Sequence, residues 1–229
     1  MEMLSSADFW LGLLKIVGVN IILSGDNAVV IALAARSLPP HQQKQAVLFG
    51  SGAAVVLRIL LTVVAARLLA MPYLQIAGGL LLLWIGVQLL GDEDQGGGER
   101  RARGTKLSAV RTILIADLVM SLDNVIAVAA AAQGSITLLV LGLAISIPLV
   151  IFGSTLLITV MERFPVIVVL GAALIGWVGG EAIASDVVLT EALASSEWLH
   201  YVAAAAGAAL VIVLGKWLSR RGQRHAEAV

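Results

Sequence analysis

The sequence predicts an all-α membrane protein with seven transmembrane helices, arranged as two inverted three-helix repeats plus a seventh helix. Three observations lead to this prediction: an apolar composition, seven span-length segments and an internal repeat. Apolar residues make up 59% of the 229 residues and charged residues 13%, whereas soluble domains have about 45–50% and about 25%. The formal net charge is zero, so no basic excess indicates a nucleic-acid partner.

Seven segments are long and apolar enough to cross a bilayer, which takes about 20 apolar residues. They cover 10–35, 45–69, 72–91, 110–132, 135–160, 164–184 and 199–218. A charged, glycine-rich linker at 92–108 separates the first three from the other four. We therefore expect a single integral membrane domain over 1–229, in contact with lipid along most of its length.

The two halves of the chain share a pattern. The unit Ser-x-Asp-Asn at 24–27 returns at 121–124, 97 positions later, and a Pro/Gly/Trp/Gly pattern at 72–86 returns at 165–179, 93 positions later. We expect repeat A at about 8–91, repeat B at about 109–184 and an extra helix at about 199–218. A repeated unit of three spans must point the opposite way the second time, as in many secondary transporters with a site near the midplane.

The distribution of basic residues predicts the orientation. With the N-terminus outside, twelve of the fifteen basic residues lie on the cytoplasmic side, as the positive-inside rule requires. No basic residue precedes Lys15, so the first segment is expected to be a retained span rather than a cleaved signal peptide. The C-terminus is then cytoplasmic.

Acidic residues lie in the middle of apolar segments, at Asp26, Asp117 and Asp123. Each costs about 2.5–3.5 kcal/mol on insertion scales and usually marks an ion or proton path. The alternative is a structural polar contact between helices. The duplication of Ser-x-Asp-Asn in the first span of each repeat favours the functional interpretation.

Helical spacing groups the polar residues of each half on one face. The first face holds Asn20, Ser24 and Asn27, and the second holds Asp117, Ser121 and Asn124. Asp26 and Asp123 lie about 100° off these faces, given 3.6 residues per turn. Gly25 favours an unwound helix at the first site, whereas Leu122 does not favour unwinding at the second. Unwound backbone would add carbonyl ligands.

The available ligands are carboxylate, amide, hydroxyl and carbonyl oxygens, which suit hard cations such as Mg²⁺, Ca²⁺ or Mn²⁺. The chain has no Cys, and its three His lie at span ends or in loops. We expect no cofactor other than the transported cation. When that ion leaves, the carboxylates are expected to take up protons, because unpaired charge is costly in a low dielectric. Cation/proton exchange is therefore a hypothesis.

Two further charged residues are candidates for an auxiliary role. Arg58 lies near the middle of the second span, where it is expected to pair with an acid as a counter-charge. The alternative is that the Arg58 side chain snorkels toward a membrane interface. Glu181 lies toward the end of the sixth span, where a proton-relay role and a solvated outer vestibule are both open.

The duplicated Ser-Gly-Asp-Asn and Ser-Leu-Asp-Asn units, the acid at Asp117 and the seven hydrophobic spans resemble the TerC family of integral membrane proteins, in its short, YjbE-like branch. The resemblance covers about 8–218. It implies a seven-helix inverted-repeat fold in the inner (plasma) membrane of a bacterium and export of Mn²⁺. The metal positions that it implies are Asp26, Asn27, Asp117, Asp123 and Asn124. Many relatives carry an acid where this chain has Asn20.

Two other functions remain open at this point: an intramembrane metal-dependent enzyme, and an assembly or insertion factor that moves no ions. The enzyme is disfavoured because no intramembrane His or Lys base is expected and because catalysis needs no symmetric site. We therefore predict a transporter and not an enzyme. The direction of transport follows only from the resemblance, and a homo-oligomer remains open.

Overall fold

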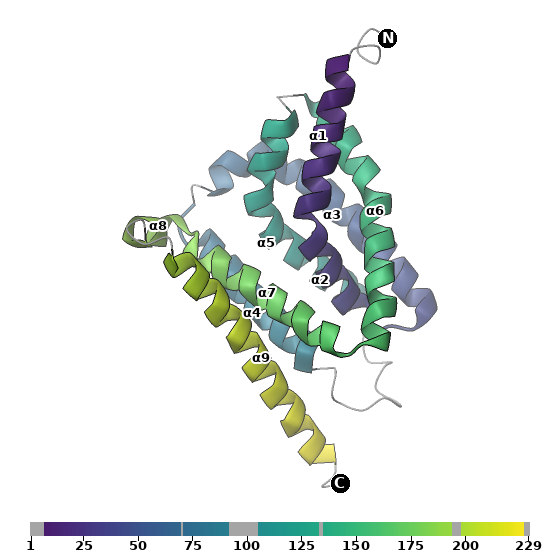
Figure 1. The fold of residues 1–229 in the computed structure, drawn as a ribbon, viewed down its shortest axis with the longest axis vertical. Helices are drawn as coiled ribbons and strands as arrows, with labels where there is room; N and C mark the ends of the chain where they lie inside the picture. The colour runs from purple at the N-terminus through teal and green to yellow at the C-terminus, as the bar shows by residue number, and fades with distance from the viewer. Residues whose placement is uncertain (1–6, 70, 92–104, 133–134, 194–197, 227–229) are drawn as a thin grey trace.

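The computed structural model describes residues 7–69, 71–91, 105–132, 135–193 and 198–226, and these are almost entirely helical, without a strand (Figure 1). The helices are α1 Ala7–Leu23, α2 Gly25–Ala35, α3 Pro40–Leu69, α4 Leu74–Gly91, α5 Lys106–Ala132, α6 Ile136–Arg163, α7 Val166–Ala184, α8 Val187–Leu193 and α9 Trp198–Ala226. The all-α prediction is confirmed over this part of the chain.

Five segments within the described residues are long and apolar enough to cross a membrane: Pro40–Thr62, Leu74–Gly91, Ile136–Arg163, Val166–Ala184 and Trp198–Arg220. Two bent helix pairs, Phe9–Leu23 with Gly25–Ala35 and Lys106–Leu122 with Asn124–Ala132, raise the number to seven if each pair is one span. The described residues therefore contain five to seven candidate spans, as expected of an integral membrane protein.

Both copies of Ser-x-Asp-Asn lie at a bend. The helix axis turns by 51° between α1 and α2, where Ser24 leaves the helix, and by 67° within α5 between Leu122 and Asn124. The first break falls at Ser24, which has φ −108° and ψ 3° and directly precedes Gly25, the first residue of α2. At the second bend Leu122 stands at the position equivalent to Gly25. The side chain of Asp123 lies outside the described residues.

Close glycine contacts join α4, α7 and α9, which run side by side (Figure 1). Gly79 of α4 meets the backbone of Gly179 on α7, and a Cβ added at Gly176 of α7 would lie 2.6 Å from the carbonyl oxygen of Gly207 on α9. Small residues let membrane helices approach backbone to backbone, where dispersion rather than the hydrophobic effect drives packing. We call α4, α7 and α9 the glycine platform.

The remaining long helices form a second group, in which α1 and α2 pack on α6 and α5 packs on α3. Ile16 of α1 fills the space over Gly142 of α6, and Ile113 of α5 does the same over Gly50 of α3. The bends of α1/α2 and α5 lie inside this group. We call it the polar bundle, because it encloses the buried polar cluster described below.

Asp186, between α7 and α8, ties the glycine platform together at one end. Its carboxylate is 0% exposed. It accepts hydrogen bonds from the backbone N–H groups of Tyr73, Gln75, Ile76 and Val188 at 3.0–3.2 Å. Burial raises the pKa of the Asp186 carboxyl, but the four backbone donors outweigh burial, so its pKa lies below its ordinary value. The side chain thus caps α4, whose preceding residue Tyr73 has φ 66°.

Several helix bounds differ from the sequence prediction, among them the second span, which begins at Pro40 rather than at 45, and the last, which ends at Ala226 rather than at 218. Two further differences concern the linker and the break before the last helix. The helix expected from residue 110 begins at Lys106, and residues 92–104 of the expected linker lie outside the described residues. The short helix α8 lies within the break expected at 185–198. Asp186 explains the second difference, because its side chain accepts from the N–H of Val188 and its carbonyl from the N–H of Thr190.

Candidate functional site

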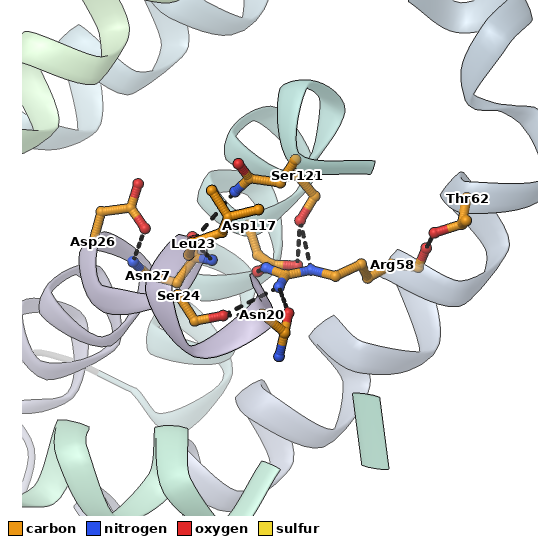
Figure 2. A network of polar contacts seen from close by, with 10 residues as sticks. Asn20, Leu23, Ser24, Asp26, Asn27, Arg58, Thr62, Asp117 and Ser121 are labelled. Carbon is orange, nitrogen blue, oxygen red and sulfur yellow. Dashed lines mark hydrogen bonds and ion pairs between the residues drawn. The ribbon is translucent and has the colours of Figure 1, made fainter. Parts of the chain in front are cut away.

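The guanidinium of Arg58 on α3 lies at the centre of the polar bundle, 4% exposed (Figure 2). Its Nη2 donates to Asp117 Oδ1 at 2.6 Å, which makes a buried ion pair between α3 and α5. Arg58 therefore has an acidic partner inside the bundle rather than a snorkelling position. Its own carbonyl accepts from the hydroxyl of Thr62, one turn further along α3.

The other donors of Arg58 reach the two polar faces expected from the sequence. Nη1 donates to Asn20 Oδ1 at 2.7 Å and to Ser24 Oγ at 3.3 Å, both at the end of α1. Nε donates to Ser121 Oγ at 3.0 Å on α5, and that hydroxyl donates to Asp117 Oδ2 at 3.2 Å. One arginine thus joins the matching residues of the two halves (Figure 2).

The break at Ser24 leaves the carbonyl of Leu23 without its usual helical donor, because the N–H of Asn27 donates instead to Asp26 Oδ1 at 2.8 Å. The side-chain amides of two asparagines use this carbonyl. Asn124 Nδ2 donates to it at 3.2 Å and Asn27 Nδ2 at 3.5 Å. The unwound backbone was expected to offer free carbonyl ligands, but at Leu23 the oxygen is already hydrogen-bonded.

A small cavity of about 20 Å³ lies beside this cluster, enough room for one water-sized ligand. It is lined by Asn20, Ser24, Asn27, Ile31, Ser51, Ala54, Val55, Arg58, Asp117, Ser146, Ile147 and Val150. The wall thus comes from α1, α2, α3, α5 and α6. The expected face of Asn20, Ser24 and Asn27 opens into it, as the i, i+4, i+7 spacing predicts.

Some predicted site residues lie elsewhere. Asp26 is half-buried and does not line the cavity, and Figure 2 shows it on the side of the α1–α2 break away from Arg58. This position agrees with its expected 100° offset. Glu181 is exposed on α7, in the glycine platform, and does not line the cavity either. The role of Asp123 stays a prediction, because its side chain is not described.

Two serines that the sequence interpretation overlooked also line the cavity. Ser51 on α3 is 2% exposed and Ser146 on α6 is 0% exposed. They lie 95 positions apart, between the offsets of 97 and 93 that relate the two halves. That spacing is the signal that would have identified them, had the repeat been followed into the second and fifth segments.

The donor set of the described residues is poor in acids. No three His, Cys, Asp or Glu side chains within the described ranges are close enough to hold a metal ion together. A cation in this cavity would meet the Asp117 carboxylate and neutral amide and hydroxyl oxygens. Hard divalent ions accept such ligands, but charge balance would demand further acids or displacement of Arg58.

Apolar helices of membrane-spanning length, bent around a buried ion pair, define the molecule as a polytopic integral membrane protein. The model of the integral membrane protein TerC family matches residues 5–223. The chain belongs to the TerC family, as the Ser-x-Asp-Asn units indicated.

Curated bacterial membrane proteins are similar to this chain. YjbE of Bacillus subtilis strain 168 is 47% identical over 78% of this chain and 82% of its own length. The inner membrane protein YoaE of Escherichia coli strain K12 is 26% identical over 96% of this chain, which spans only 45% of that longer protein. YkoY of Bacillus subtilis is 25% identical over 73% of this chain. No solved structure matches the chain significantly.

Proposed function

We propose that this protein is a secondary transporter that exports a hard divalent cation, with Mn²⁺ as the favoured substrate and Ca²⁺ or Mg²⁺ as the alternatives. The observation that carries the proposal is the polar cluster at the two bends. Arg58 there contacts Asn20 and Ser24 of one half and Asp117 and Ser121 of the other. Intramembrane ionisable residues usually mark an ion path.

The proposed topology treats each bent pair as one span, which gives seven spans in two inverted three-helix units plus α9. The N-terminus is then outside and the C-terminus cytoplasmic, in the inner (plasma) membrane of a bacterium. Figure 1 supports an odd number of crossings, because α1 begins and α9 ends at opposite ends of the molecule. A site between inverted units suits alternating access, whereas an enzyme has no need of this arrangement.

In the proposed substrate site, Asp117 supplies the carboxylate, and Asn20, Ser24, Asn27, Ser121 and Asn124 supply neutral oxygens. Asp26 lies beside it as an acid that joins when the bends change, and Asp123, at the equivalent sequence position of the second unit, is assigned the same role. Arg58 is the counter-charge of the cation-free state, because the ion pair leaves the buried cluster without net charge. A gradient of protons or of the metal itself drives transport.

The decisive test is uptake of Mn²⁺, Ca²⁺ and Mg²⁺ into proteoliposomes that contain the purified protein. We expect divalent-ion flux in the wild type and at least about a hundredfold less in Asp117→Asn. Flux should persist in Glu162→Gln, which removes an exposed acid of α6 and serves as the matched control. Equal flux in Asp117→Asn and the wild type would refute the proposed site. The absence of flux in the wild type would refute the proposed function.

Direction and the role of Asp123 are tested in cells. Expression should raise tolerance to external Mn²⁺ if the protein exports the ion, and Asp123→Ala should abolish that gain while the protein still inserts. A wild-type chain that lowers tolerance would indicate import. Flux that is unchanged when the proton gradient is collapsed would remove the exchange hypothesis.

A further inference from the structure

Two buried oxygens in the cavity wall lack a hydrogen-bond partner among the described residues: Asn27 Oδ1 and Ser51 Oγ. Their residues are 3% and 2% exposed. Buried polar atoms in native proteins nearly always have a partner, so each exception needs an explanation. Both exceptions in the described chain face the same cavity, from α2 and from α3.

The hydroxyl of Ser51 differs from those of other buried serines in these helices. Serines within a helix commonly donate to the carbonyl four residues earlier. Ser146 and Ser154 of α6 do so, to Gly142 and Val150 at 2.9 and 2.7 Å. Ser51 makes no such bond, so its hydroxyl is left for a ligand in the cavity.

The side-chain amide of Asn27 also has an atom without a hydrogen-bond partner among the described residues. Its Nδ2 donates to the Leu23 carbonyl, which leaves Oδ1 as the group without a partner. An amide oxygen can only accept a hydrogen bond or coordinate a cation. The ligand of this cavity must therefore be electropositive on the side that faces Asn27.

We propose that Ser51 is a ligand of the transported cation, and that the cavity shared by Ser51 Oγ, Asn27 Oδ1 and Asp117 is where that cation binds. The inference rests on the proposed function and adds a ligand from α3 that neither Ser-x-Asp-Asn unit supplies. The cavity holds one water-sized ligand, which matches a single cation that has lost most of its water.

Arg58 competes with the cation for this position. Its guanidinium lines the same cavity and already binds the Asp117 carboxylate. A divalent ion beside an intact Arg58–Asp117 pair would add two uncompensated charges to a buried site. The cation and the arginine therefore occupy the cluster alternately, and the structure corresponds to the arginine-bound form. Ser51 Oγ and Asn27 Oδ1 gain a partner only in the cation-bound form.

Sulfur substitution tests the ligand role directly. The chain has no cysteine, so Ser51→Cys introduces its only thiol. Sulfur is a soft ligand that favours Cd²⁺ over the hard Mn²⁺. In competition binding to the purified full-length protein, we expect Ser51→Cys to shift preference toward Cd²⁺ by at least about tenfold relative to the wild type. Ser154→Cys, a buried serine of α6 outside the cavity, should leave the preference unchanged.

Ser51→Ala provides a second measurement if the cysteine variant folds poorly. It removes the hydroxyl with almost no change in volume, so we expect Mn²⁺ affinity to fall several-fold while thermal stability is retained. Preference and affinity that match the wild type in both Ser51 variants would overturn the inference and leave the proposed function standing. A wild-type protein that binds neither ion would overturn the proposed function and this inference together.

Discussion

Asp117 and Asp186 are both buried, at 6% and 0% exposure, yet their surroundings differ in kind. Asp186 accepts hydrogen bonds from four backbone N–H groups, three at the start of α4 in the glycine platform and one at the start of α8. Asp117 is held by side chains alone, those of Arg58 and Ser121 in the polar bundle. Backbone donors cannot leave without unfolding a helix end, whereas a side chain can rotate away. The platform thus holds a fixed charge, whereas the proposed function requires the charge in the bundle to exchange its partner.

The packing of the two regions differs as well, since close backbone contacts join the platform and the bundle encloses a cavity. Helices of the glycine platform touch backbone to backbone, as Gly176 and Gly207 show. The polar bundle contains both bends and the cavity. Packed helices move as rigid units, and bends absorb changes in backbone angle. This comparison predicts that substitutions in the platform alter stability without altering cation binding, whereas those at the polar cluster of the bundle alter cation binding whether or not they alter stability.

The largest loss of stability is expected from Asp186→Ala. Four backbone N–H groups lose a charged acceptor, and one of these hydrogen bonds is buried while three are partly buried. Hydrogen bonds to a charged group contribute about 1.5–3 kcal/mol each, and because water replaces part of this we expect a loss of roughly 4 kcal/mol or more. Thermal unfolding in detergent measures it. Glu181→Ala, which removes an exposed acid at the same end of α7, is the control and should change little. Equal unfolding temperatures in the two variants would contradict the fixed-charge assignment.

The next largest effect is expected from Asp117→Asn, which leaves Arg58 buried without its acid. Removing one partner of a buried ion pair costs about 3–5 kcal/mol. The double variant Arg58→Met/Asp117→Leu removes both charges, and such replacements are often neutral. We therefore expect the double variant to unfold at a higher temperature than Asp117→Asn while it still binds no divalent cation. A double variant less stable than Asp117→Asn would show that the pair is structural in the way Asp186 is.

A smaller effect is expected from Gly180→Ala in the platform. The added Cβ would collide with the backbone of Ala203 on α9, and overpacking of this kind costs about 1–3 kcal/mol. Gly153→Ala on α6 is the matched control, because nothing lies within 4 Å of its added Cβ. Thermal unfolding should separate the two variants. Cation affinity should be the same in both, and a lower affinity in Gly180→Ala would contradict the division into two regions.

The smallest expected effect is the pH dependence of the stability that Asp186 provides, which is absent near neutral pH. Its folded-state pKa lies below the ordinary value of 3.8. Its contribution to stability is therefore complete above about pH 5 and is lost as the pH falls through the folded-state pKa. The difference in unfolding temperature between the wild type and Asp186→Asn should stay constant from pH 7 to about pH 5 and shrink below about pH 4. A difference that shrinks between pH 7 and pH 6 would contradict this assignment.

Much of the architecture follows from the sequence, since apolar length and helical periodicity are local properties. The all-helical class, the ranges of the long helices and the shared face of Asn20, Ser24 and Asn27 could all be read in this way. The duplicated Ser-x-Asp-Asn units also indicated where to look for irregular backbone, and both units lie at bends.

Other features depend on contacts between distant segments. The residues around Ser51 in the sequence do not distinguish it from Ser154. Ser51 lines the cavity because α2 and α6 approach α3 there. Asp186 follows α7 without any motif, and its role comes from the start of α4, more than 100 residues earlier. In both cases the partner is backbone or a cavity wall, which leaves no local pattern in the sequence, and only the long-range repeat relates Ser51 to Ser146.

Composition and periodicity are enough to predict an apolar helical membrane protein with acids at two related positions, because burial in lipid selects residues one position at a time. The partners of each buried acid depend on the tertiary structure. Asp117 meets the side chain of Arg58 and Asp186 meets backbone N–H groups, and that choice is made by helices that are adjacent in space but distant in the chain.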